Sequence, residues 1–241
     1  KCSPGFKSLR MSKMKKVLSF ALEIGHVDRI PNMKRVKDKR PPIVTFTLGQ
    51  LADFIAAGER MGPAAHIAAL LTADMGLRAG EVCGLPWGDV NLERCEVIVC
   101  HNGSEGSGNT PKGTVGTLTM SQALHRALTV HRTREPIGPL VLYRTHRRGE
   151  WVPYNQPALH RLLQAICKEA GLGEQCSGRF LRHSCLTAMG DLGASPVEIQ
   201  SHARHALLST TERYLHPQQQ RHAADAMARL DLARGGRKDP V

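Results

Sequence analysis

Four short segments of this sequence combine basic side chains with glycine or hydroxyl groups in a way that suits an anionic ligand. In the first, G-L-R-A-G-E, Gly76 and Gly80 flank Arg78, and Glu81 follows three residues later to hold the guanidinium. A guanidinium is a planar fork that can donate to two phosphate oxygens at once. Arg78 is therefore a candidate phosphate ligand, and a simple Arg78–Glu81 ion pair is the alternative.

The second and third segments add further cations. Lys112 lies at a T-P-K-G tip between two expected strands, where its ammonium could reach a neighbouring site, although a solvated loop lysine is the simpler interpretation. The third segment, S-G-R-F-L-R-H-S-C-L-T, carries Arg179, Arg182 and His183 in an otherwise apolar helical pattern. Because Arg179 and Arg182 are three residues apart, we expect them on the same side of a helix. They either face solvent or hold an anion inside the fold.

The fourth segment is H-A-L-L-S-T-T-E-R-Y-L-H-P, in which His205 precedes Tyr214 by nine residues. Ser209 is a suitable N-cap for a short helix that carries Tyr214. A tyrosine on an amphipathic helix is usually part of the core. It becomes a candidate nucleophile when arginine, lysine and histidine side chains lie within its range.

Composition restricts the class of protein. The chain has 241 residues, of which 41% are apolar, so it can form one good core, or a core with a small appendage. Lys and Arg outnumber Asp and Glu by 33 to 21, and the net charge of +12 suits a polyanionic partner, although a basic but unspecialised protein is the alternative. No G-x-G-x-x-G or G-K-[ST] motif is present, which excludes a Rossmann or P-loop site.

Cysteine usage and hydropathy bear on location. The seven cysteines form no C-x-x-C pair, which favours reduced thiols in a cytoplasmic protein over a disulfide framework or a metal knuckle. No apolar run reaches the ~18 residues of a membrane span, and no secretory leader is evident. The sequence begins with Lys1 rather than Met, so we expect it to be a fragment of a longer chain.

The elements that must position these residues are mostly helical. We expect helices over 8–26, 51–60, 64–75, 79–85, 121–134, 155–170, 179–192, 196–203, 209–215 and 221–233. Strands at 95–100 and 114–120 should pair across a Gly-rich loop, and 139–143 is strand-like. The fold class is therefore mainly α with a small antiparallel β-sheet (α+β). A capping box in T-L-G-Q marks the start of a domain at Thr47.

The helix over 8–26 has an apolar stripe that a single helix cannot bury, so we assign residues 1–28 as the C-terminal helix of another domain. Residues 29–46 form a basic linker, 47–217 the main domain, and 218–241 a C-terminal helix and tail. The linker is suited to crossing a nucleic-acid backbone. Its candidate DNA-binding residues are Lys34, Arg35, Lys37, Lys39 and Arg40.

Together the four segments resemble the tyrosine recombinases, the phage-integrase type of site-specific DNA recombinase. The resemblance rests on G-L-R-A-G-E with the following L-P-W-G-D-V, on T-P-K, on L-R-H-S-C-L-T and on H-A-L-L-S-T-T-E-R-Y-L-H, and it extends from about Thr45 to Pro217. It implies the catalytic-domain fold of that family. Residues before about 30 resemble the last helix of the family's core-binding DNA domain.

The resemblance also implies a reaction and the residues that perform it. Tyr214 would attack the scissile phosphate and form a 3′-phosphotyrosyl link, without metal, cofactor or ATP. Arg78 and Arg182 would clamp the phosphate oxygens, and Lys112 would protonate the leaving 5′ oxygen. His205 would donate a hydrogen bond to the phosphate. Glu81 would support Arg78.

Two positions depart from the family pattern. Arg179 occupies the first position of the usual His-x-x-Arg box, and an arginine cannot accept the tyrosine proton near neutral pH. It could still stabilise a phenolate or the transferring phosphate electrostatically, and the related type IB topoisomerases carry a basic lysine at the corresponding place. The family's Leu-Gly-His is Ala203-Arg204-His205 here, which could displace the histidine if the glycine position needs a positive φ.

Three functions follow from these observations. An active recombinase in the cytoplasm of a prokaryotic cell, associated with the nucleoid, is favoured. The alternatives are a type IB topoisomerase-like nicking-closing enzyme and a catalytically impaired relic that only binds DNA. The partner is double-stranded DNA. The C-terminal helix has an apolar stripe at Ala223, Ala224, Met227 and Leu230 that must pack either within the chain or on another protomer. In the family that the four segments resemble, the last helix often docks on a neighbouring protomer, so the resemblance implies a tetramer on DNA.

Overall fold

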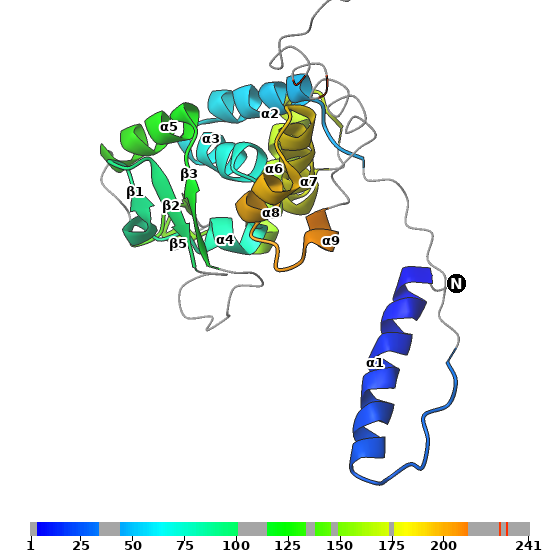
Figure 1. Ribbon diagram of the computed structural model, residues 1–241. Helices are drawn as coiled ribbons and strands as arrows, with labels where there is room; N and C mark the ends of the chain where they lie inside the picture. Colours follow the sequence, from blue (N-terminus) through cyan, green and yellow to red (C-terminus); the bar gives the residue numbers. More distant parts are fainter. Residues whose placement is uncertain are drawn as a thin grey trace, which may run out of the picture. The chain divides into compact units, whose positions relative to one another are not determined.

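The computed structural model describes residues 4–33, 44–100, 115–133, 138–145, 149–173 and 176–211 together with positions 227 and 230. The chain forms two compact units, Lys1–Ile43 and Val44–Val241 (Figure 1). In the described parts, helices predominate and the strands form two small antiparallel sheets, so the predicted mainly α class is confirmed. No described helix is both long and apolar enough to cross a membrane.

The N-terminal unit contains one long helix, α1 (Pro4–Glu23), which starts and ends a few residues earlier than predicted. Gly25 follows it at a φ of +74°, and the His26 amide donates to the Ala21 carbonyl. The large apolar side chains of α1 are exposed, among them Phe6, Leu9, Met14, Val17 and Phe20. Large apolar side chains of this helix are therefore exposed in the described structure.

The second unit begins with two consecutive helices, α2 (Leu48–Met61) and α3 (Pro63–Ala69). Thr47 caps α2 through the predicted capping box: its hydroxyl accepts from the Gln50 amide and the Gln50 side chain accepts from the Thr47 amide. The helix predicted over 64–75 is not regular throughout, because it widens into a π-helical turn at Leu70–Asp74. There the Thr72 hydroxyl donates to the Ala68 carbonyl at 2.7 Å, the acceptor that a regular α-helix would give to the Thr72 amide.

The predicted hairpin is present as β2 (Glu96–Val99) and β3 (Gly116–Thr119), which pair antiparallel with Val97 opposite Leu118. The sequence did not predict a third strand, β1 (Val90–Asn91), at the edge of this sheet. The buried side chains of this sheet, including Val97 and Leu118, belong to the main hydrophobic core.

The strand predicted at 139–143 is wrong in its extent. The second sheet pairs β4 (Tyr143–Thr145) with β5 (Trp151–Pro153), while Leu140 makes only an isolated bridge with Pro86. The Trp87 amide donates to the Pro139 carbonyl, but Pro139 has no amide hydrogen to donate in return, so the ladder loses a hydrogen bond on that side.

Helices complete the unit. After the hairpin come α5 (Gln122–Thr133), α6 (Gln156–Glu169), α7 (Gly178–Asp191), α8 (Pro196–Ala203) and α9 (Leu208–Thr211). Figure 1 shows α3 near the middle of this unit, with the strands and α5 on one side and α6, α7 and α8 on the other. Of the predicted helix at 221–233, only Met227 and Leu230 are described, and both are helical and exposed.

The elements that carry the site are a short helix and the long helix behind it. α4 (Ala79–Cys83) follows the π-helical turn, and α7 packs against that turn with most of its length buried. Gly178 in the first turn of α7 lies so close to α4 that a β-carbon there would be 3.3 Å from the Ala79 β-carbon. The starts of α4 and α7 are therefore fixed against each other.

Candidate active site

Arg78 is held at the start of α4 by Glu81. Its backbone amide donates to Glu81 Oε2 at 2.8 Å, and its Nη1 donates to Glu81 Oε1 at 2.9 Å. The Arg78 side chain keeps 27% of its surface exposed, whereas that of Glu81 keeps 1%. The buried carboxylate thus fixes the orientation of a guanidinium that a ligand can still reach, which is the contact that the three-residue spacing predicted.

Glu81 also pairs with a second arginine. Arg204 Nη2 donates to Glu81 Oε2 at 2.7 Å, in an ion pair that is buried on both sides. Burial alone would raise the pKa of Glu81, but the hydrogen bond and charge of Arg204, together with the hydrogen bonds from Arg78, outweigh it and lower the pKa. Glu81 is therefore ionised and shared between two guanidinium groups.

Arg182 is buried in α7 and joins two distant segments of the chain. Its Nη1 donates to the Gly76 carbonyl at 2.7 Å, and its Nη2 donates to the Ala203 carbonyl at the end of α8. Ser177 caps α7 by accepting from the Phe180 amide, so the helix that presents Arg182 starts at a defined residue. Arg182 thereby brings the segment before Arg78 next to the segment before His205.

His205 lies beside this arginine. The distance from Arg182 Nη2 to His205 Nε2 is 3.4 Å, and that from His205 Nδ1 to Thr211 Oγ1 is 3.0 Å. Because a guanidinium only donates, Nε2 is the acceptor and Nδ1–H donates to Thr211. Burial, followed by the positive charges of Arg182 and Arg78, lowers the pKa of His205 to about 4. The free imidazole is therefore neutral near neutral pH.

The position before His205 has the left-handed backbone conformation that a glycine adopts easily. Arg204 ends α8 at a φ of 53° and a ψ of 47°. The replacement of glycine by arginine has not displaced the histidine from Arg182, because Arg204 itself adopts the positive φ. Its side chain turns inward to Glu81, a contact that the sequence analysis missed.

Arg179 is in a different environment from Arg182. It lies in the first turn of α7, it is exposed, and its Nε donates to His183 Nε2 at 3.3 Å. The three-residue spacing placed the two arginines on one side of the helix, yet only Arg182 is buried among backbone carbonyls. Arg179 is accessible to a ligand at the surface.

Several predicted residues lie outside the described part of the chain. These are Lys112, Tyr214 and the linker residues Lys34, Arg35, Lys37, Lys39 and Arg40. The structure brings together Arg78, Glu81, Arg182 and His205, and it adds Arg204 and Thr211. Thr211 is buried and six residues after His205, a spacing that carries no sequence signal of its own. Among the described residues, no group of three or more His, Cys, Asp or Glu side chains could hold a metal ion.

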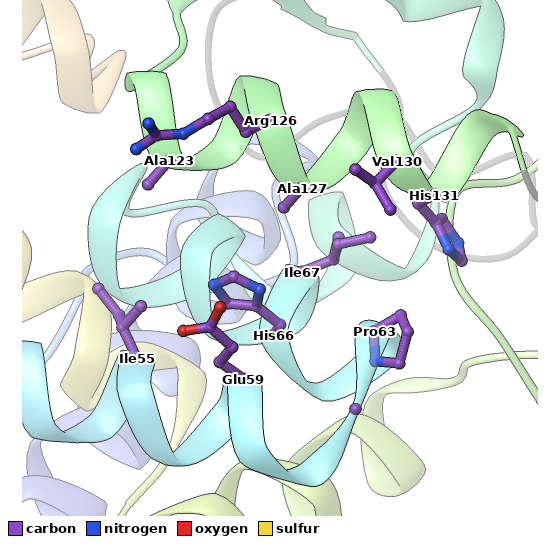
Figure 2. Close-up of a pocket in the computed structure, with 11 residues that line it drawn as sticks. Ile55, Glu59, Pro63, His66, Ile67, Ala123, Arg126, Ala127, Val130 and His131 are labelled. Atoms are coloured by element: carbon purple, nitrogen blue, oxygen red, sulfur yellow. The ribbon is translucent and has the colours of Figure 1, made fainter.

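A pocket of about 660 Å³ lies elsewhere on the same unit, between α2, α3 and α5. Figure 2 shows Ile55, Ile67, Ala127 and Val130 among the apolar side chains of its wall, with Glu59 and Arg126 also lining it. None of the predicted catalytic residues that the structure describes lines this pocket. The candidate active site is therefore the arginine and histidine cluster around the ends of α4, α7 and α8.

The guanidinium groups of Arg78 and Arg182 and the imidazole of His205 lie together in this cluster, and guanidinium groups are suited to donating to phosphate oxygens. The sequence model of the phage integrase family matches residues 46–221, which are most of the chain. The chain belongs to the phage integrase family.

Known relatives support this assignment. The tyrosine recombinase XerC of Corynebacterium efficiens is 29% identical over 191 residues, which are 75% of this chain and 58% of that protein. The tyrosine recombinase XerD of Listeria innocua is 27% identical over 141 residues, 58% of this chain and 46% of that protein. The chain thus spans about half the length of these relatives.

Solved structures share the fold. The Tn1549 transposon integrase in complex with a circular intermediate DNA superposes with a TM-score of 0.76 at 18% identity, covering 95% of this chain and 80% of that one. A lambda integrase dimer bound to a core site gives a TM-score of 0.63 at 18% identity, covering 99% of this chain and 62% of that one. The predicted tyrosine recombinase catalytic-domain fold is therefore confirmed.

Proposed function

We propose that this chain is the catalytic part of a site-specific DNA recombinase that cleaves and rejoins DNA strands through a 3′-phosphotyrosyl intermediate. The proposal is supported above all by the proximity of Arg78, Arg182 and His205, which come from three segments: Arg182 lies 3.4 Å from His205, and the charge of Arg78 acts on the same imidazole. The relatives named as recombinases and the neighbours solved with DNA support the same function.

In the proposed reaction, the Tyr214 hydroxyl loses its proton to water, and the phenolate oxygen attacks the scissile phosphorus. A bond from the tyrosine oxygen to phosphorus forms while the bond from phosphorus to the 5′ oxygen breaks, so the phosphodiester energy is kept in the covalent link and no ATP is needed. Lys112 gives a proton to the departing 5′ oxygen. Arg78 and Arg182 offset the negative charge that develops on the phosphoryl oxygens, and this occurs without a metal ion.

His205 and Arg179 act electrostatically in this scheme. A phosphate bound against Arg182 and His205 would favour protonation of the imidazole, because an adjacent anion stabilises the charged form. The imidazolium would then donate to a phosphoryl oxygen. Arg179, exposed in the first turn of α7, would stabilise the tyrosine phenolate in place of a proton acceptor.

A nicked DNA duplex that traps the cleaved strand tests the proposal. After incubation with the protein, a denaturing gel should show a covalent protein–DNA adduct that is lost in Tyr214→Phe. Salt-sensitive DNA binding without any adduct would instead support the DNA-binding relic. Joining of the cut strand to a new partner supports the recombinase, whereas relaxation of supercoils without such joining supports the topoisomerase-like enzyme.

The assembly that we propose is a homo-tetramer on double-stranded DNA, joined through the C-terminal helix over 221–233. Its basis is the apolar stripe of that helix, of which Met227 and Leu230 are exposed in the described structure. Light scattering of the DNA complex should give the mass of four protomers for the full chain, and smaller complexes for a chain that ends at Pro217. Equal masses for both chains would contradict docking through this helix.

The remaining parts of the proposal concern the N-terminal segments and location. Residues 1–28 would end a core-binding domain and residues 29–46 would cross the DNA backbone. The protein would act in the cytoplasm of a prokaryotic cell, on the DNA of the nucleoid.

A further inference from the structure

Arg204 connects three segments that carry proposed catalytic residues. Its Nη2 donates to Glu81 Oε2 at 2.7 Å, and Glu81 holds Arg78. Its backbone is the residue immediately before His205. The stem of its side chain lies against β3, the strand that follows the Lys112 loop, where a β-carbon at Gly116 would be 3.0 Å from Arg204 Cδ.

The conformation and burial of Arg204 are unfavourable by themselves. A left-handed backbone conformation is strained for any residue with a β-carbon. The Nε and Nη1 atoms are buried and have no hydrogen-bond partner among the described residues, and burying such donors opposes folding. A strained and incompletely paired residue next to a catalytic site indicates a functional role rather than a gain in stability.

The charge balance indicates what that role is. Glu81 carries one negative charge and contacts two guanidinium groups, so the three side chains together keep one positive charge. If Arg204 were absent, Glu81 would neutralise Arg78 alone. The second arginine therefore leaves more of the positive charge of Arg78 for a phosphate.

We propose that Arg204 is a positioning residue of this site: through Glu81 it fixes Arg78 relative to His205, and it keeps the Arg78 charge available to the scissile phosphate. The proposal rests on the proposed recombinase function. Arg204 does not touch the DNA in this scheme, because its side chain is 3% exposed. Its effect is exerted through Glu81 and through the end of α8.

Three variants separate the side chain from the backbone. Arg204→Gly removes the ion pair and also removes the strain and the buried unpaired donors, so this variant should fold. Arg204→Met keeps the stem against Gly116 without charge, and Arg204→Lys keeps the charge. We expect single-turnover cleavage of the nicked duplex to be about 10- to 100-fold slower in the Gly and Met variants, with DNA affinity unchanged and partial recovery in the Lys variant.

Two controls make the test specific. Arg60→Met breaks the exposed ion pair between Arg60 and Glu169, 3.4 Å apart, and should leave cleavage unchanged. In a double-mutant cycle, Arg204→Gly should lower the cleavage rate of a Glu81→Gln chain by much less than it lowers that of the wild type. The reason is that each substitution breaks the same Arg204–Glu81 ion pair. If the fold-reductions in cleavage rate of the two single variants multiply in the double variant, Arg204 acts independently of Glu81.

A second measurement keeps this proposal separate from the recombinase function. If the wild type forms no Tyr214 adduct, the recombinase function fails, and Arg204 is then tested through NMR titration of the His205 imidazole. Among the described residues, the charged groups that lower the pKa of that imidazole, besides its burial, include Arg182, Arg78, His183 and Arg204. Arg204→Gly should raise the pKa of His205 from about 4, and Arg204→Lys should raise it less. If the wild type cleaves DNA, an equal cleavage rate in Arg204→Gly overturns the proposal. If the wild type does not cleave DNA, an equal pKa of His205 in both chains overturns it.

Discussion

His205 makes the stability of the fold depend on pH, because its pKa differs between the folded and the unfolded chain. Burial and the cations around it lower the pKa of His205 from an ordinary 6.5 to about 4 when the chain folds. Above pH 6.5 both states are neutral and the full stability is present. Between pH 6.5 and 4 the unfolded chain binds the proton and the folded chain does not, so the free energy of unfolding falls as the pH is lowered.

Replacing His205 should reduce the dependence of stability on pH. The free energy of unfolding, measured in urea at several values between pH 7.5 and 4.5, should fall less steeply for His205→Asn than for the wild type. The comparison is needed because the lowered pKa values of His202 and Glu81 give slopes of the same sign. Identical slopes for both chains would show that His205 is not shielded from protonation.

Arg179 allows a direct test of the missing proton acceptor. If the reaction is limited by the lack of a base at this position, Arg179→His should raise single-turnover cleavage of the nicked duplex by about 10-fold or more, because a well-placed base contributes at least this much. Arg179→Gln serves as the control, since it removes the charge and the bond to His183 without adding a base. An Arg179→His chain with unchanged or slower cleavage would mean that no base is required here.

At the scale of elements, the turn before α4 determines where Arg182 binds. Gly76 has a φ of +66°, a β-carbon there would lie 3.1 Å from Cys185 Sγ, and its carbonyl accepts from Arg182. Gly76→Ala should therefore lower the free energy of unfolding by about 1–3 kcal/mol and slow cleavage through Arg182. Urea unfolding checks the stability. Gly88→Ala is the matched control, because the space around Gly88 is open and its φ is not positive; equal losses in both variants would contradict the argument.

Sequence patterns predicted the long elements better than the short ones. The capping box at Thr47 and the helical periodicity of α6 and α7 are local features, so they could be read directly. The two-residue strand β1 pairs with β2, and the π-helical turn at Leu70–Asp74 packs against α7, so both elements are in contact with other segments of the chain. Such elements have too few residues to establish a period.

At the scale of the whole molecule, part of the site could be predicted and part could not. The Arg78–Glu81 contact follows from a spacing of three residues at a helix start. The Arg204–Glu81 pair joins residues 123 positions apart, and it depends on the left-handed backbone at Arg204 and on the close approach of β3. Sequence alone indicated only that the family's glycine is replaced by Arg204, and it suggested that this replacement could displace His205. The structure instead shows that the Arg204 side chain binds Glu81.

The basic linker gives a prediction for the intact chain on DNA. Each protein cation that neutralises a phosphate lowers the slope of log affinity against log salt by about 0.9. If Lys34, Arg35, Lys37, Lys39 and Arg40 all contact the backbone, replacing the five with Gln should make the slope shallower by about 4.5, as measured by fluorescence anisotropy from 50 to 200 mM salt. A chain with Arg60→Gln and Lys168→Gln, two exposed cations on α2 and α6, should keep the original slope. If the slope instead became shallower by the same amount per removed charge in both chains, net charge rather than the linker would determine the affinity.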